Sequence, residues 1–148
     1  MNNFLITLLF FMISGCVSND ILVKLPQPVL QIIYFDVVQK DLVVEADIPE
    51  NLELLINNWF DNKIKLNGLE GNMIFKITKY NEDITLIDDG KRVDILLSFE
   101  IILTKSSQSK KEFIEGNISS FGSLTGEFSL NDFDNIIKKA QDDIMFFL

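Results

Sequence analysis

The chain has 148 residues with one cysteine, no histidine and a formal net charge of −9, and these values limit its size and its chemistry. The length suits one domain with one hydrophobic core, and the acidic charge disfavours nucleic acid, whose phosphates are bound by lysine and arginine. Because there is no histidine and no second cysteine, we expect no cofactor, no metal site of the usual zinc composition, no histidine base and no internal disulfide.

The N-terminal stretch has the most specific pattern in the sequence. Residues 4–13 (FLITLLFFMI) form an apolar run in which Thr7 is the only polar residue. As a helix this run would be about 15 Å long, which is about half the thickness of the hydrocarbon core of a membrane. It is therefore typical of the apolar part of a signal peptide and too short to span a membrane stably.

The end of this run, Ile13-Ser14-Gly15-Cys16, resembles the lipobox of bacterial lipoproteins, in which an aliphatic residue and two small residues precede the cysteine. The resemblance implies that Ile13, Ser14 and Gly15 are recognised by the signal peptidase. It also implies that the chain is cut before Cys16 and that the thiol of Cys16 carries lipid. Two features depart from the pattern, because residues 1–3 contain no lysine or arginine and isoleucine at position 13 replaces the commoner leucine.

The lipobox would divide the chain into a signal peptide at residues 1–15, a lipidated N-terminus and tether at residues 16–28, and a single periplasmic domain at residues 29–148. Val17 follows the cysteine, whereas aspartate at that place favours the inner membrane in enteric bacteria. The resemblance therefore implies an outer-membrane lipoprotein that faces the periplasm. The alternative is that the apolar run is a buried helix or strand and the cysteine an ordinary core residue.

The tether has two interpretations that the sequence leaves open. Pro26 and Pro28 favour an extended backbone that holds the domain away from the membrane. Residues 21–25 (ILVKL) are mostly apolar and would equally suit an edge strand. Residues 29–44 (VLQIIYFDVVQKDLVV) are rich in β-branched and aromatic side chains, so we expect the first strand there, bent near Gln39.

A helix is expected over residues 51–64, because apolar residues recur there at steps of three and four. The residues on this apolar face are Leu52, Leu55, Ile56, Trp59 and Phe60. Asp47 and Glu50 form a capping-box pattern before the helix, and Gly68 is the expected C-terminal cap. Because Trp59 shares the apolar face, we interpret it as a core residue rather than as a contact for lipid or a partner.

The next part of the chain alternates apolar and polar residues with a period of two, which predicts strands. Residues 72–87 change parity, which predicts a bulge near residues 81–83, and Asp89-Gly90 predicts a hairpin turn. The strand after this turn has an apolar face made of Val93, Ile95, Leu97, Phe99, Ile101 and Leu103. Residues 112–124 are expected to form a third long strand.

A last helix is expected to begin near Ser129, with Asp132 as its capping-box partner. Its inner face would consist of Phe133, Ile136, Ile137, Ala140, Ile144 and Phe147. Phe146 lies outside this face and is our candidate for a contact with a partner protein. The order β-α-β-β-β-α predicts an α+β fold of two layers, with an antiparallel meander sheet and two helices on one face.

This order resembles that of small envelope lipoproteins, including the LptE-type lipoprotein of lipopolysaccharide assembly and the auxiliary lipoproteins of lipid-transport ABC systems. Residues 48–68, with Trp59 in their helix, are similar to a stretch of uncharacterised alphaproteobacterial lipoproteins. The resemblance implies a non-enzymatic accessory or scaffold protein, bound to the membrane by its lipid and to an envelope protein complex, that assists lipid or lipopolysaccharide transport or outer-membrane assembly. A periplasmic carboxylate-dependent hydrolase and a purely structural lipoprotein are the alternatives, and the oligomeric state stays open.

Overall fold

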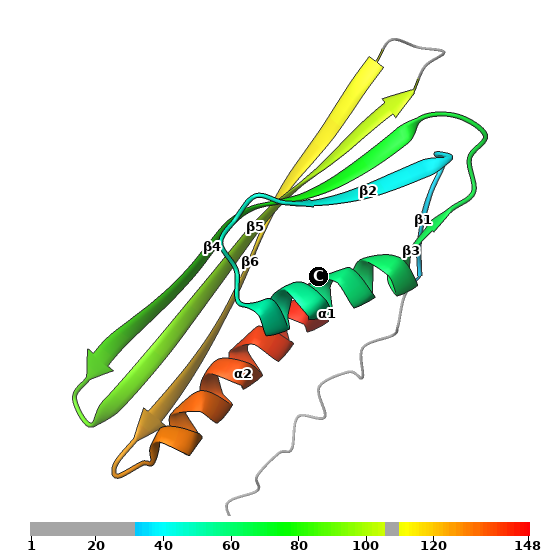
Figure 1. The fold of residues 1–148 in the computed structure, drawn as a ribbon. Coiled ribbons are helices and arrows are strands. Elements are labelled where there is room, and N and C mark those ends of the chain that lie inside the picture. Colours follow the sequence, from blue (N-terminus) through cyan, green and yellow to red (C-terminus); the bar gives the residue numbers. More distant parts are fainter. Residues whose placement is uncertain (1–31, 106–109) are drawn as a thin grey trace, which may run out of the picture.

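The computed structural model describes residues 32–105 and 110–148 of the chain. These residues form six strands and two helices (Figure 1). In chain order they are β1 (Ile33–Phe35), β2 (Gln39–Val44), α1 (Glu50–Lys63), β3 (Ile64–Leu66), β4 (Asn72–Ile87), β5 (Gly90–Lys105), β6 (Lys110–Thr125) and α2 (Leu130–Phe147). The predicted signal peptide, lipobox and tether lie outside the described residues.

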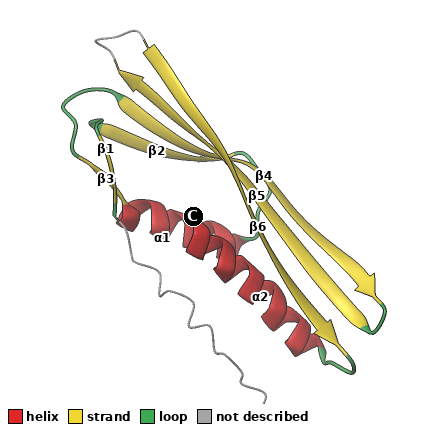
Figure 2. Ribbon diagram, turned by 180° about the vertical axis from the view of Figure 1, so that it is seen from behind, coloured by secondary structure: helices red, strands yellow, loops and turns green. Residues whose placement is uncertain are grey.

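The main sheet has the strand order β2-β4-β5-β6, and both helices lie on one of its faces (Figure 2). This arrangement confirms the α+β fold of two layers. β4, β5 and β6 form the expected antiparallel meander. β2 pairs with β4 in parallel, so the sheet is mixed, and α1 belongs to the crossover that two parallel strands require.

β1 and β3 form a separate parallel pair, in which Ile33 lies opposite Ile64. The prediction of a single strand over residues 29–44 was wrong, because β1 and β2 belong to different sheets. Between these two strands Val37 turns into the core, where only 1% of its surface is exposed. Burial of this one side chain therefore interrupts a stretch whose composition favours continuous β-structure.

Gly68 lies against the turn at Val37, and its prediction as the cap of α1 was wrong. The helix ends at Lys63, where the N–H of Ile64 donates to the carbonyl of Phe60. The N–H of Gly68 donates to the carbonyl of Val37 at 3.2 Å, and a Cβ at position 68 would lie 2.3 Å from the backbone nitrogen of Val37. Glycine is needed there because two backbone segments approach each other closely.

The two helices differ at their first residues. α2 begins with the predicted capping box, because the N–H of Asp132 donates to Oγ of Ser129 at 3.2 Å and the N–H of Ser129 donates to the carboxylate of Asp132 at 2.9 Å. The capping box predicted from Asp47 and Glu50 was wrong. α1 starts at Glu50 with Pro49 as its N-cap residue and no side-chain cap, so Asp47 lies two residues too early.

The core lies between the main sheet and the helices, and Phe75 of β4 is a central member. The ring centroid of Phe75 lies 5.3 Å from that of Trp59, 6.1 Å from that of Phe60 and 5.2 Å from that of Phe99. Trp59 thus packs against the core as the sequence predicted. Leu55, which was expected on the same face, is exposed.

The hairpin of β4 and β5 contains a register shift between Ile77 and Lys79. A bulge was predicted in this strand near residues 81–83, so its position was wrong by a few residues. Before the shift, odd-numbered residues such as the buried Ile77 face the helices. After it, even-numbered residues do so, because Ile84 lies opposite the buried Val93.

The turn between β4 and β5 starts one residue earlier than predicted. Ile87 pairs with Gly90, so the two-residue loop consists of Asp88 and Asp89. Gly90 instead meets the third strand of the meander, where a Cβ would lie 1.8 Å from the carbonyl oxygen of Leu124. Glycine at this position therefore allows close contact between β5 and β6 rather than an unusual turn conformation.

The strands of the meander are much longer than the helices. β4, β5 and β6 have 16 residues each, so each spans about 50 Å. α1 has 14 residues and α2 has 18, which correspond to about 21 Å and about 27 Å. α2 packs on β6 and β5, so the end of β4 beside the β4–β5 turn has no helix beneath it (Figure 1).

Candidate functional site

The sheet edge formed by residues 81–87 of β4, called the distal edge below, is open to solvent. β2 accompanies β4 only along residues 72–77, and the N–H groups of Glu45 and Ala46 both donate to the carbonyl of Ile77 where β2 leaves the sheet. Beyond that point β4 pairs only with β5 within residues 32–105 and 110–148. Every second residue of the distal edge therefore points its N–H and C=O groups away from the sheet.

Apolar side chains are exposed along this edge. Ile84 is 53% exposed, Leu86 is 78% exposed and Ile87 is 36% exposed. Ile84 and Leu86 lie on the face that carries the helices, since they pair with Val93 and Lys91 of β5. They remain uncovered because α2 packs beneath β5 and β6. The distal edge thus combines open backbone groups with apolar surface.

The distal edge and the adjoining turn are acidic, with no lysine or arginine in residues 81–89. The carboxylates are those of Glu82, Asp83, Asp88 and Asp89. Two basic residues of β5 lie nearby but have partners within the fold. Nζ of Lys91 lies 4.9 Å from the ring centroid of Phe133. Arg92 donates to the carboxylate of Asp94 from Nε at 2.8 Å and from Nη2 at 2.6 Å, which lowers the pKa of Asp94.

A shallow hollow of about 210 Å³ lies beside the distal edge and includes Asn81 and Asp83 in its lining. Arg92 and Phe121 also line it, and the guanidinium carbon of Arg92 lies 4.6 Å from the ring centroid of Phe121. Since Arg92 is also bonded to Asp94, its guanidinium group is already paired within the fold. The hollow is therefore a polar surface feature rather than a prepared anion site.

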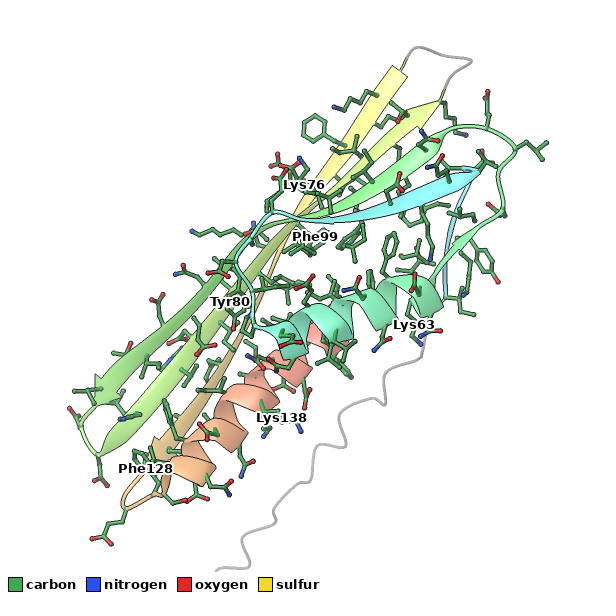
Figure 3. All side chains as sticks on the ribbon, in the orientation of Figure 1. Lys63, Lys76, Tyr80, Phe99, Phe128 and Lys138 are labelled. Atoms are coloured by element: carbon green, nitrogen blue, oxygen red, sulfur yellow. The ribbon has the colours of Figure 1, made fainter. Side chains whose placement is uncertain are left out.

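A chain of hydrogen bonds joins both helices to β4 at Tyr80, next to the distal edge. Figure 3 labels Tyr80 on β4. Gln141 of α2 is 4% exposed, accepts a hydrogen bond from Asn51 of α1 at 2.7 Å and donates to the hydroxyl of Tyr80 at 3.4 Å. The hydroxyl of Tyr80 donates to Glu82 at 2.7 Å. Burial, with the bond to Glu82 second, raises the pKa of Tyr80 to about 12. The phenol therefore keeps its proton at neutral pH and serves as a hydrogen-bond donor.

Lys40 of β2 closes the C-terminal end of α1. Its Nζ donates to the carbonyls of Phe60 and Ile64, both at 2.8 Å, and lies 4.5 Å from the ring centroid of Phe60. Burial lowers the pKa of Lys40, and the carboxylate of Asp61 at 3.9 Å opposes that change. The ammonium group satisfies carbonyls where a helix favours positive charge, so its role is structural.

The described part of the chain has neither a metal-binding cluster nor a membrane-spanning helix. Residues 32–105 and 110–148 contain no group of three or more cysteine, aspartate or glutamate side chains placed to hold a metal ion. Neither helix in these ranges is long and apolar enough to cross a membrane. Among the described residues, the distal edge is the surface best suited to bind a partner, because it alone combines an open strand edge with a single sign of charge.

The residues singled out from the sequence lie elsewhere. Phe146 is 46% exposed near the end of α2, as expected of a residue outside the apolar face. Phe147 is 64% exposed, so its prediction as a core residue was wrong. The apolar face of α2 that packs against the core continues from Ile144 to Leu148, four residues later, and does not include Phe147. Cys16 and the lipobox residues before it lie outside the described residues.

The distal edge itself was not singled out from the sequence. The alternation over residues 72–87 was recognised as a strand, but alternation does not say what lies beside or beneath it. No signal of length could have found it, because the first strand was expected over residues 29–44. In the structure β2 has only 6 residues, so it cannot pair with all 16 residues of β4.

No protein-family model and no curated protein matches the sequence. Among solved structures, the chain is similar to a minor lipoprotein from Acinetobacter baumannii, with a TM-score of 0.48 and 15% identity over 74% of this chain and 87% of that one. It is also similar to rare lipoprotein B from Shewanella oneidensis, with a TM-score of 0.46 and 8% identity over 73% and 86%. A lipoprotein from Neisseria meningitidis has a TM-score of 0.32 and 11% identity over 72% and 97%. These three similar structures are all bacterial lipoproteins.

Proposed function

We propose that this protein is a lipid-anchored, non-enzymatic accessory protein of the bacterial cell envelope, held on the outer membrane and facing the periplasm. The observation that carries the proposal is the sequence Ile13-Ser14-Gly15-Cys16 directly after an apolar run of signal-peptide length. Cys16 is the only cysteine of the chain, so it is the single residue to which a thioether-linked lipid can attach. Cleavage before it would make Cys16 the first residue of the mature protein.

The lipid would hold the protein at the membrane permanently. Each buried methylene group contributes about 0.8 kcal/mol, and a single acyl chain gives only reversible binding. A diacylglyceryl group on Cys16, with or without a third chain on the new N-terminus, makes anchoring stable. The folded domain would then act at the membrane surface, within reach of integral envelope proteins.

The accessory role is supported by the open surfaces of the domain. Within residues 32–105 and 110–148 no strand pairs with the outer side of the distal edge, and Leu86 and Ile84 expose apolar surface beside it. Proteins usually protect such edges, because unprotected strands bind other chains. We propose that the domain uses its exposed surfaces to bind a component of an envelope-transport or outer-membrane assembly complex.

Metabolic labelling with radioactive palmitate in a bacterial host tests the anchor. The wild-type protein is expected to incorporate label, and Cys16→Ser is expected to incorporate none. A matched control, Cys16→Ser combined with Ser18→Cys, keeps one thiol but moves it two residues out of the lipobox, and it is also expected to remain unlabelled. Equal labelling of wild type and Cys16→Ser would show that the anchor proposal is wrong.

The accessory role is tested by mild crosslinking in the bacterium that makes the protein, followed by affinity purification and mass spectrometry. We expect a membrane transporter or an outer-membrane assembly protein to be enriched relative to the Cys16→Ser variant. That variant is the appropriate control, since it has the same domain without the lipid on Cys16. Enrichment of no envelope component would contradict the accessory role.

A further inference from the structure

We infer that the distal edge binds an extended segment of a partner protein by strand addition, and that this segment alternates basic and apolar residues. The inference rests on the proposed accessory function for its statement that the partner is an envelope protein. The chemistry of the edge is independent of the anchor. It follows from the backbone, the exposed side chains and the charges of residues 81–89.

The backbone provides the first argument. β2 lies beside the first part of β4 and leaves the sheet after Val44, with the N–H groups of Glu45 and Ala46 both bonded to Ile77. A partner strand placed beside residues 81–87 would continue the sheet in the space beyond β2. Strand addition satisfies main-chain donors and acceptors of both chains and depends little on side-chain identity.

The distal edge has few of the devices that protect exposed strands. Residues 81–87 contain no proline and no lysine, and the register shift of β4 lies before them, between Ile77 and Lys79. Glu82 points to the helix-bearing face but accepts a hydrogen bond from Tyr80, which holds its carboxylate within the fold. The distal edge is therefore available to pair with a strand of another protein.

Exposed side chains determine the apolar half of the partner segment. Ile84 and Leu86 lie on the same face of the sheet and are 53% and 78% exposed. Alternate side chains of an added strand would point to this face and cover them. Apolar residues at every second position of the partner would bury this surface, which is the favourable term in most protein association.

The charges determine the other half of the segment. Asp83 lies directly opposite Asp94, and Arg92 is bonded to Asp94. Like charges opposite each other in neighbouring strands are destabilising. Asp88 and Asp89 add two further carboxylates at the adjoining turn. A partner with lysine or arginine at alternate positions would reduce this repulsion on the face away from the helices.

The same charges disfavour a second copy of this chain as the partner. Two distal edges paired with each other would place the carboxylates of both copies, those of Glu82, Asp83, Asp88 and Asp89, along one seam with no lysine or arginine from residues 81–89. Such a pair would be opposed by repulsion that a basic segment does not meet. A basic segment of another protein therefore fits the distal edge better than a second copy of this chain does.

The opposite edge of the sheet, along β6, is less suited to strand addition. β6 contains Gly116, where the ring of Phe99 lies 2.3 Å from a would-be Cβ, and Gly122, which packs against Ile136. Glycine within a strand weakens pairing. β6 also begins with Lys110-Lys111 and carries charges of both signs, so it lacks the uniform charge of the distal edge.

A synthetic peptide that alternates lysine and valine, as long as the distal edge and labelled with a fluorophore, tests the inference. Binding to the full-length protein in detergent is measured by fluorescence anisotropy. We expect saturable binding that weakens as salt is added, because exposed charges are screened. A peptide of the same length and charge, in which proline replaces the central valine, is expected to bind at least ten-fold more weakly, since proline cannot donate to the ladder of main-chain hydrogen bonds. Equal binding of both peptides would show that the interaction is charge attraction alone, and it would overturn the inference of strand addition.

Two matched variants locate the site. Leu86→Lys places a positive charge on the distal edge, and we expect it to weaken peptide binding at least ten-fold. Leu69→Lys makes the same change at a residue that is 97% exposed in the loop before β4, and we expect binding within two-fold of wild type. Circular dichroism checks that both variants keep the fold, as expected for side chains that are largely exposed. Unchanged binding by a folded Leu86→Lys variant would overturn the assignment of the site.

Two further readouts separate this inference from its alternatives. Analytical ultracentrifugation of the wild-type protein is expected to show no dimer formed through the distal edge. A wild-type dimer that the Leu86→Lys substitution abolishes would show that the edge binds a second copy of this chain, and it would contradict the inference of a basic partner. Palmitate labelling at Cys16 is expected to be the same in wild type and Leu86→Lys. Failure of peptide binding with intact labelling contradicts the docking inference alone, whereas absent labelling with intact peptide binding contradicts the anchor alone.

Discussion

The two halves of β4 show how differently one strand can be used. Residues 72–77 bury Met73, Phe75 and Ile77, with β2 on one side and aromatic rings of α1 below. Residues 79–87 alternate with the opposite parity, expose Ile84, and have no strand beside their outer edge among the described residues. The difference is caused by what lies nearby, because the strand is longer than the elements that cover it. Apolar alternation therefore defines a face, and only the surrounding elements decide whether that face becomes core or binding surface.

The largest effect should separate the two halves directly. Phe75→Ala removes a ring that contacts three other aromatic rings and is expected to lower the free energy of unfolding by about 3–5 kcal/mol. Leu86→Ala shortens a side chain that is 78% exposed and is expected to change the free energy of unfolding by less than about 0.5 kcal/mol. Urea denaturation of the purified protein measures both values. Similar losses for the two substitutions would mean that the distal half is not an open surface.

A smaller effect is expected at the boundary between the two halves. Gln141→Leu removes the buried amide that links Asn51 to Tyr80 and should lower the free energy of unfolding by about 1–3 kcal/mol. Asn135→Leu alters an exposed amide of the same helix and serves as the control, with a change below about 0.5 kcal/mol. Urea denaturation curves of the two variants measure the difference in the free energy of unfolding. Equal stability of the two variants would show that the hydrogen bonds of Gln141 do not stabilise the fold.

The helix beside the distal half should depend on its capping box. Ser129→Ala removes the hydroxyl that caps α2 and is expected to lower the free energy of unfolding by about 1 kcal/mol. Asp47→Ala changes the residue that the sequence pattern had offered as a cap for α1, and it is expected to cost less than about 0.5 kcal/mol. Thermal unfolding of both variants measures the difference. A larger loss for Asp47→Ala would contradict the observed start of α1.

The last effect, absent at neutral pH and visible only in alkali, concerns Tyr80. Its pKa is raised to about 12 in the folded protein against 10.0 for the free side chain. Below pH 10 both states hold the phenolic proton and the stabilising contribution is complete. It is lost as the pH rises from 10 through about 12, because the unfolded chain gives up its proton first. We expect the free energy of unfolding to decline over this window in wild type and in Tyr34→Phe, and to decline less in Tyr80→Phe.

Local sequence signals predicted the parts of the fold that local contacts determine. The capping box of α2 involves residues three apart, and the apolar face from Val93 to Leu97 is determined by strand alternation. Long-range contacts decided the rest. The turn of Val37 into the core and its contact with Gly68 depend on backbone segments about thirty residues apart, which periodicity does not describe.

The functional features also differ in whether local sequence could predict them. The lipobox at Cys16 can be recognised from consecutive residues and stays a prediction, since it lies outside the described residues. The distal edge could not be recognised from consecutive residues. Its openness depends on where β2 leaves the sheet, beside Ile77, and on α2 lying beneath β5 and β6. Sequence patterns identified residues 72–87 as a strand without showing that the outer half of this strand has an open edge.

The register shift at Thr78 has a consequence for how this strand can vary. Because side chains alternate along a strand, one extra residue exchanges the two faces for everything that follows. Deleting Thr78 would turn Asn81 and Asp83 toward the helices and move Ile84 and Leu86 to the other side. The presence of Thr78 thus determines which side chains of the outer half of β4 face the helices. Changes in the length of β4 should therefore be tolerated far less than changes in its composition.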